Sequence, residues 1–128
     1  MARRCFLSAK IHGATITSAR LEYRGSLSID AALLRAAGIL PYEQVEVYNL
    51  DNGERLTTYA IPGAAGEICL NGAAAHKGAV GQRLIIVTYA WLETAEALAH
   101  EPRVCIAGHD NAVEEVLTGR VRPDFPQE

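Results

Sequence analysis

The chain has 128 residues, a length typical of one domain, and 49% of them are hydrophobic, which is enough to build a core. Its net charge of -3 leaves no basic excess to neutralise phosphates, so no nucleic-acid partner is expected. No apolar run approaches the roughly 20 residues that span a bilayer. Lys10 also follows the charged start too early for a signal sequence, so no membrane partner is expected.

Three cysteines lie far apart along the chain: Cys5, Cys69 and Cys105. Their number is odd, and none belongs to the short C-x-x-C spacing of zinc and redox sites. This pattern predicts reduced thiols in the core of a cytoplasmic protein, with neither a disulfide framework nor a zinc site.

The chain opens with a predicted strand over residues 5–12, where side chains alternate between two faces and Lys10 and His12 share one of them. Short extended pieces are expected at 14–17 and 20–23. A helix is predicted over 31–37, a run of good helix formers that ends at a glycine and begins after a capping Ser or Asp.

A β-hairpin is predicted from residues 44–50 and 55–61, because they flank an Asn-Gly pair at 52–53. Alternation in its second strand places Arg55 and Tyr59 on one face. Such a pair is often an ordinary surface contact. A guanidinium and a phenol can also bind the carboxylate of a small anionic substrate and donate a proton to it.

Three more short strands are expected at 68–70, 84–90 and 103–107, and a brief helix is expected at 94–100. Many short strands with two short helices indicate a mainly β barrel and not a βαβ fold. The barrel domain is expected to span residues 1–108. Residues 109–128 are expected to form a loosely ordered C-terminal tail.

Gly25 and Ser26 carry the most distinctive chemistry of the sequence. A Gly-Ser pair is usually a plain turn. Glycine, however, lets its carbonyl be approached closely, so that the next serine hydroxyl can attack it and replace the amide by an ester. Elimination from that ester leaves a dehydroalanine, which hydrolyses to a pyruvoyl group. The chain would then carry its own ketone.

Other catalytic assignments have weaker support. Gly25-Ser26 lacks the G-x-S-x-G elbow of many serine hydrolases. The histidines show no paired ligand spacing, so no metal site is predicted from His12, His76, His100 and His109. An uncut barrel that binds a ligand or partner without catalysis is the main alternative from another class of protein.

Separate motifs of the chain together resemble the pyruvoyl-dependent aspartate 1-decarboxylases. They are Tyr23-Arg24-Gly25-Ser26, residues 51–61 and Asn71-Gly72-Ala73-Ala74-Ala75-His76, in the same order and at the same spacing. Lys10-Ile11-His12 and Ser28-Ile29-Asp30 agree as well. The resemblance covers roughly residues 3–107.

This resemblance implies a double-psi β-barrel that assembles as a cytoplasmic homotetramer with active sites between subunits. It implies a proenzyme that is cut between Gly25 and Ser26, with or without a maturation factor, and a covalent pyruvoyl cofactor derived from Ser26. The reaction would convert L-aspartate to β-alanine and CO₂, for pantothenate and coenzyme A synthesis.

The resemblance also implies roles for individual residues. The ketone at Ser26 would form a Schiff base with the substrate amine, and Tyr59 would donate a proton to the carbanion left by CO₂. Six residues are expected to bind substrate: Lys10, Arg55, Thr58, Gly72, Ala73 and Ala74. Thr58 is also expected to stabilise the oxyanion of the Gly25 carbonyl during cleavage.

Thr58 does not fit the ideal strand, because alternation turns it away from Arg55 and Tyr59. Two explanations are open. Either the strand contains a bulge at this point, or Thr58 acts in another way, for instance across a subunit boundary.

Overall fold

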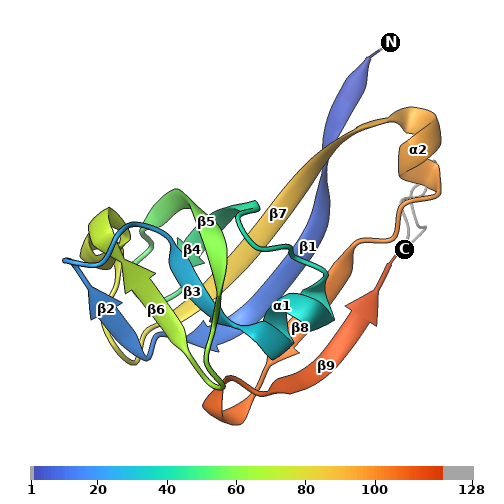
Figure 1. Ribbon diagram of the computed structural model, residues 1–128. Coiled ribbons are helices and arrows are strands. Elements are labelled where there is room, and N and C mark those ends of the chain that lie inside the picture. The colour runs from blue at the N-terminus through green and yellow to red at the C-terminus, as the bar shows by residue number, and fades with distance from the viewer. Residues whose placement is uncertain (1, 120–128) are drawn as a thin grey trace.

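The computed structural model describes residues 2–119, whose nine strands form a single sheet (Figure 1). The elements in chain order are β1 (Arg3–Thr15), β2 (Ser18–Arg20), β3 (Leu27–Asp30), α1 (Ala31–Ala37), β4 (Gln44–Asn49), β5 (Arg55–Gly63), β6 (Ile68–Asn71), the 3-10 helix η1 (Gly72–Lys77), β7 (Arg83–Glu93), α2 (Thr94–Leu98), β8 (Arg103–Ala107), the 3-10 helix η2 (His109–Asn111) and β9 (Val113–Thr118). The expected mainly β fold with two short α-helices is confirmed. No helix within residues 2–119 is long and apolar enough to cross a membrane.

The strands lie in the order β2-β6-β3-β5-β4-β7-β1-β8-β9, so several neighbours in the sheet are far apart in the chain. Three of these pairs are parallel: β1 with β8, β2 with β6, and β3 with β5. Parallel neighbours require connections that cross the barrel, as expected for a double-psi barrel. The sheet curves around one core, whose central side chains include Ile11, Leu27, Ile29, Leu33, Val47, Leu70 and Ile86.

Helix α1 begins and ends where the sequence predicts. The Asp30 carboxylate accepts a hydrogen bond from the Ala32 N–H at 2.7 Å, which satisfies one free donor of the first turn. Gly38 closes the helix with φ +76°, a left-handed conformation that suits glycine. The other Asp30 oxygen accepts from the Gly66 N–H at 2.7 Å, which ties the helix start to the β5–β6 loop.

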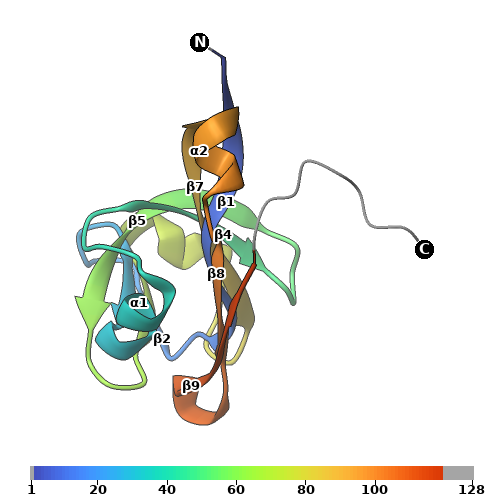
Figure 2. The ribbon, with the colours of Figure 1, turned by 90° about the vertical axis from the view of Figure 1, so that its right-hand side faces the viewer.

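Strands β1 and β7 are long enough to extend beyond the barrel as an arm, with α2 at its far end (Figures 1 and 2). Their pairing runs from Arg3 opposite Glu93 to Thr15 opposite Arg83. Cys5 lies on this arm and is exposed, whereas Cys69 and Cys105 are buried. The expectation that all three thiols lie in the core is therefore wrong for Cys5, because the arm has no core beneath it.

Residues 109–118 form ordered structure, which corrects the expected domain boundary at residue 108. Strand β9 pairs antiparallel with β8, and η2 precedes it. The buried Asn111 accepts a hydrogen bond from the Thr15 N–H at 2.7 Å and donates to the carbonyls of Thr15 and Gly66, each at 2.9 Å. The part of the expected tail from residue 120 onward lies outside the described residues.

We predict that Asn111→Ala lowers the free energy of unfolding by about 2–4 kcal/mol, because it leaves three backbone groups without their hydrogen-bond partner. Urea unfolding followed by circular dichroism measures the change. Glu115→Ala is the control, since Glu115 lies exposed on β9. Equal stability of the two variants would contradict this account of Asn111.

Candidate active site

The loop between β2 and β3 leads directly into Ser26. The sequence suggests extended structure over 20–23, but β2 ends at Arg20 and residues 21–26 form turns and bends. Ser26 has φ +98° and is only 2% exposed. A non-glycine residue at positive φ is strained by a cost of order 1–3 kcal/mol, so the surrounding structure must hold it there. The Gly25–Ser26 junction therefore combines burial with backbone strain.

Asn71 provides much of that support from the end of β6. Its Nδ2 donates to Ser26 Oγ at 3.2 Å and to Ser28 Oγ at 2.9 Å. Its main-chain N–H donates to the Ser26 carbonyl at 3.0 Å. Sequence reasoning did not assign Asn71 a function of its own, although a buried strand that ends in Asn-Gly is a detectable signal. The contacts fix the Ser26 hydroxyl oxygen and leave its hydrogen free to be donated.

Gly72 presses its backbone against the loop that carries Gly25. A Cβ on Gly72 would lie 2.8 Å from the Gly25 nitrogen and 2.9 Å from the Tyr23 carbonyl oxygen. Its φ of +61° also favours glycine. Gly72 thus lies against the Gly25–Ser26 junction, and its role in substrate binding stays a prediction. Ala73 and Ala74 follow it in the same 3-10 turn, the first exposed and the second buried.

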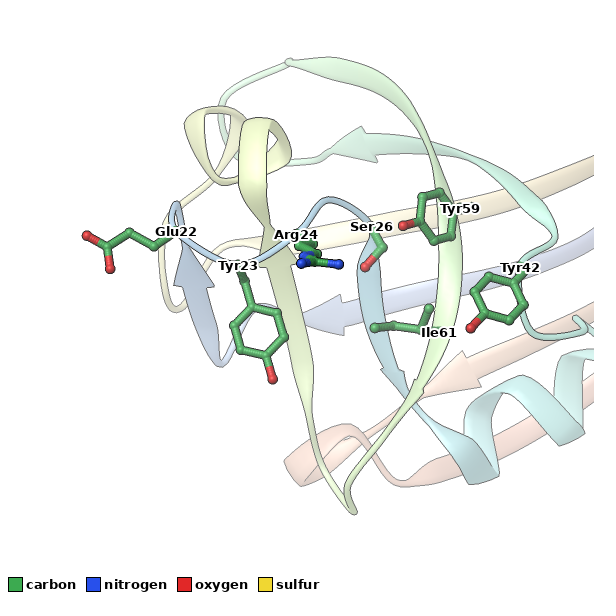
Figure 3. A pocket seen from close by; sticks show the side chains of 7 residues that line it. All are labelled: Glu22, Tyr23, Arg24, Ser26, Tyr42, Tyr59 and Ile61. Carbon is green, nitrogen blue, oxygen red and sulfur yellow. The ribbon is translucent and has the colours of Figure 1, made fainter.

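Tyr59 reaches Ser26 through the parallel pairing of β3 with β5. Leu27 lies opposite Ala60, so the residues just before them, Ser26 and Tyr59, lie side by side. In Figure 3 the Tyr59 hydroxyl points toward Ser26. Both line one pocket of about 470 Å³, together with Glu22, Tyr23, Arg24, Tyr42 and Ile61.

Thr58 follows the ideal alternation of the strand. The β4–β5 register runs without a shift from Gln44 opposite Tyr59 to Tyr48 opposite Arg55. Thr58 pairs with Val45, which is fully buried, and so faces inward. No hydrogen bond of its hydroxyl occurs within residues 2–119. The suggested bulge at Thr58 is therefore absent from this ladder.

Lys10 and Arg55 lie on the outer face of the sheet and do not line the Ser26 pocket. The Arg55 guanidinium stacks over the Tyr48 ring at 4.4 Å. Lys10 lies on β1, from which β7 and β4 separate the Arg55 strand. One chain by itself does not bring these two cations to Ser26.

The ring beneath Arg55 is held by a second tyrosine. The Tyr48 and Tyr89 hydroxyl oxygens lie 2.9 Å apart. This hydrogen bond, and then desolvation, raise the pKa of Tyr48 to about 12, so the Tyr48 phenol stays neutral at physiological pH.

No group of three His, Cys, Asp or Glu side chains that could hold a metal occurs in the part of the chain described.

Comparison with known proteins identifies the family. A family model described as aspartate decarboxylase matches residues 1–114. The chain belongs to this family. A relative from Acaryochloris marina, named Aspartate 1-decarboxylase, is 56% identical over 114 residues, which cover 88% of this chain and 87% of the relative. A relative of the same name from Desulfotalea psychrophila is 53% identical, and the match covers 87% of this chain and 95% of the relative. One from Bacillus subtilis is 46% identical, and the match covers 89% of this chain and 91% of the relative. The resemblance that the motifs suggested is confirmed.

We predict that Gly72→Ala displaces the loop at Tyr23–Gly25, because the new Cβ overlaps backbone atoms there. Limited trypsin digestion, with each variant made in the uncut Ser26→Ala chain, should then cut after Arg24 several times faster. Gly53→Ala is a matched control: it carries the same left-handed cost of about 1–2 kcal/mol, but nothing lies within 4 Å of its Cβ. Similar digestion of both variants would show that strain alone, and not the overlap, governs the loop.

Proposed function

We propose that this chain is a pyruvoyl-dependent lyase that decarboxylates L-aspartate to β-alanine and CO₂, for pantothenate and coenzyme A synthesis. Family membership supports the reaction. The observation that carries the proposal is the buried Ser26 hydroxyl, in a strained backbone, next to the Gly25 carbonyl and in one pocket with Tyr59.

Self-cleavage would begin when Ser26 Oγ attacks the Gly25 carbonyl carbon. The amide C–N bond breaks, an ester forms, and the proton of Oγ passes to the released amine. Loss of the Ser26 Cα proton then expels the Gly25 carboxylate and leaves a dehydroalanine. Water converts this to a ketone and ammonia. Release of the positive φ at Ser26 favours the first step, and the Asn71 amide holds the attacking oxygen in place.

Position 26 fits a pyruvoyl group, because the residue is almost fully shielded from water and yet forms part of a pocket wall. The ketone supplies an electron sink for decarboxylation. The Tyr59 phenol, on the same wall, would donate the proton that replaces CO₂. The main chain of Gly72, Ala73 and Ala74 would hydrogen-bond the substrate, and Thr58 would stabilise the Gly25 oxyanion during cleavage.

The remaining substrate contacts would come from another copy of the chain. Lys10 and Arg55 suit carboxylate binding but lie away from the Ser26 pocket of their own chain. A homotetramer with sites between subunits would bring them to the Ser26 pocket of a neighbour. Exposed apolar side chains such as Leu40 (69%) and Trp91 (67%) are consistent with association. We also place the enzyme in the cytoplasm, in keeping with its free thiols.

The first test is the mass of the denatured protein. We expect two pieces, residues 1–25 and a 103-residue piece (128 − 25), and a single 13.8 kDa species for Ser26→Ala. Borohydride in the presence of aspartate should label only the cut wild-type chain. A wild-type chain that stays intact, both alone and in a cell extract that supplies any maturation factor, would instead favour an uncut binding barrel.

Tyr59→Phe should still cleave itself but lose turnover by about 10²–10⁴-fold, because the ring stays in place while the proton donor is removed. Turnover per cleaved chain is the quantity to measure. Tyr42→Phe is the comparison, since its ring centroid lies 6.0 Å from that of Tyr59 in the same pocket. Full turnover in Tyr59→Phe, or the larger loss in Tyr42→Phe, would refute the assignment.

A further inference from the structure

Two tyrosines lie on the outer face of the sheet next to Arg55. Tyr48 is directly opposite Arg55 in the β4–β5 ladder, and the Arg55 guanidinium carbon lies 4.4 Å from the centre of the Tyr48 ring. Within residues 2–119 the guanidinium takes part in no ion pair, and this stack is its one specific contact. The position of the cation therefore depends on the Tyr48 ring.

The Tyr48 ring is in turn held against the sheet by Tyr89. Tyr48 lies opposite Ile85 on β7, and Tyr89 follows Ile85 by four residues, about 13 Å further along that strand. The two hydroxyl oxygens nevertheless lie 2.9 Å apart, so the two side chains lean toward each other along the sheet. Val87 lies between them on the same face and is only 3% exposed, which agrees with rings that pack against the sheet.

The stack leaves the Arg55 guanidinium free to bind an anion. A guanidinium is planar and its N–H donors point outward in that plane, whereas an aromatic ring contacts only its face. The nearby carboxylate of Glu46 accepts a hydrogen bond from the Thr57 hydroxyl at 2.8 Å and forms no ion pair with Arg55. The edge of the guanidinium is thus available for a bidentate bond to another carboxylate.

A cation that is already fixed binds a carboxylate more tightly than a mobile one, because a free arginine side chain must lose its rotamer freedom when the ligand binds. We propose that Tyr48 is a positioning residue, which fixes the Arg55 guanidinium for a carboxylate of the substrate, and that Tyr89 holds Tyr48 in this orientation. The inference rests on the proposed function, because it takes Arg55 as a substrate contact.

Graded variants of the two tyrosines test this role. In cleaved chains, Tyr48→Leu should raise the KM for L-aspartate by about 5- to 10-fold and leave kcat within about 2-fold of wild type, because the cost of ordering Arg55 falls on substrate binding. Tyr89→Phe and Tyr48→Phe keep both rings and remove only the hydrogen bond, so each should raise KM by about 2- to 3-fold. Self-cleavage and the sedimentation coefficient should stay unchanged. A wild-type KM in Tyr48→Leu would overturn the inference.

A double-variant cycle shows whether Tyr48 acts through Arg55. Arg55→Ala should raise KM more than Tyr48→Leu does, and the addition of Tyr48→Leu to Arg55→Ala should then change KM by less than about 2-fold. Effects that multiply would mean that Tyr48 supports the substrate by another route, and would contradict the proposal. Leu117→Ala is the control, since it removes a side chain of similar exposure (46%) from β9, and it should leave KM unchanged.

The orientation of Arg55 can also be observed without substrate. Its Nε–H signal in the NMR spectrum is the arginine signal that is missing from Arg55→Ala, and the Tyr48 ring should shift it upfield. Tyr48→Leu should abolish this shift, and Tyr89→Phe should reduce it. A wild-type signal without an upfield shift would refute the fixed stack. If the wild-type chain neither cleaves nor decarboxylates, the proposed function fails, and this signal alone then decides whether the tyrosines fix Arg55.

Discussion

The parallel pairing of β3 with β5 is the constraint on which the candidate site depends. It sets Leu27 opposite Ala60, and so places Ser26 beside Tyr59, although 32 residues lie between these two in the chain. Strand β6 pairs with the other edge of β3 and carries Asn71 to the same place. Three strands from different parts of the sequence thus converge on one bond of the backbone.

The same convergence explains how strain is kept at that bond. A serine at φ +98° would relax if its surroundings allowed it. Asn71 holds its oxygen atoms, the bare backbone of Gly72 limits the loop before it, and the buried Leu27 anchors the strand after it. The cost of the strained residue is offset by the packing of the barrel around it, which is the usual arrangement at a reactive site.

Local signals in the sequence predict local structure well here. The cap at Asp30, the glycine at 38 and the Asn-Gly turn were enough to predict α1 and the β4–β5 hairpin. The parallel pairs could not be derived in this way, since no short-range pattern encodes contact between distant strands. The strand alternation at Thr58 was also correct, and only the motif resemblance made it look anomalous.

The errors have a shared physical origin. Cys5 follows the alternation of core residues, but it lies on an arm that extends beyond the core. Residues 109–118 look polar because β9 is exposed along its length. That strand is ordered by its antiparallel ladder with β8, and the buried amide of Asn111 fixes the turn before it through contacts to residues 15 and 66, none of which the local sequence reveals. The roles of Arg55 and Lys10 stay predictions: they come from the resemblance, and within one chain neither residue lines the Ser26 pocket.

The placement of the two N-terminal strands determines what a break after Gly25 would leave behind. Strand β1 pairs with β7 and β8, and β2 pairs with β6, so neither of them forms backbone hydrogen bonds with β3. Scission would therefore remove a covalent link without removing a ladder. The product would be a heterodimer of fragments in each barrel, whose refolding is at least bimolecular. Its resistance to unfolding would then rise with protein concentration, and the denatured pieces could not regain their original connectivity.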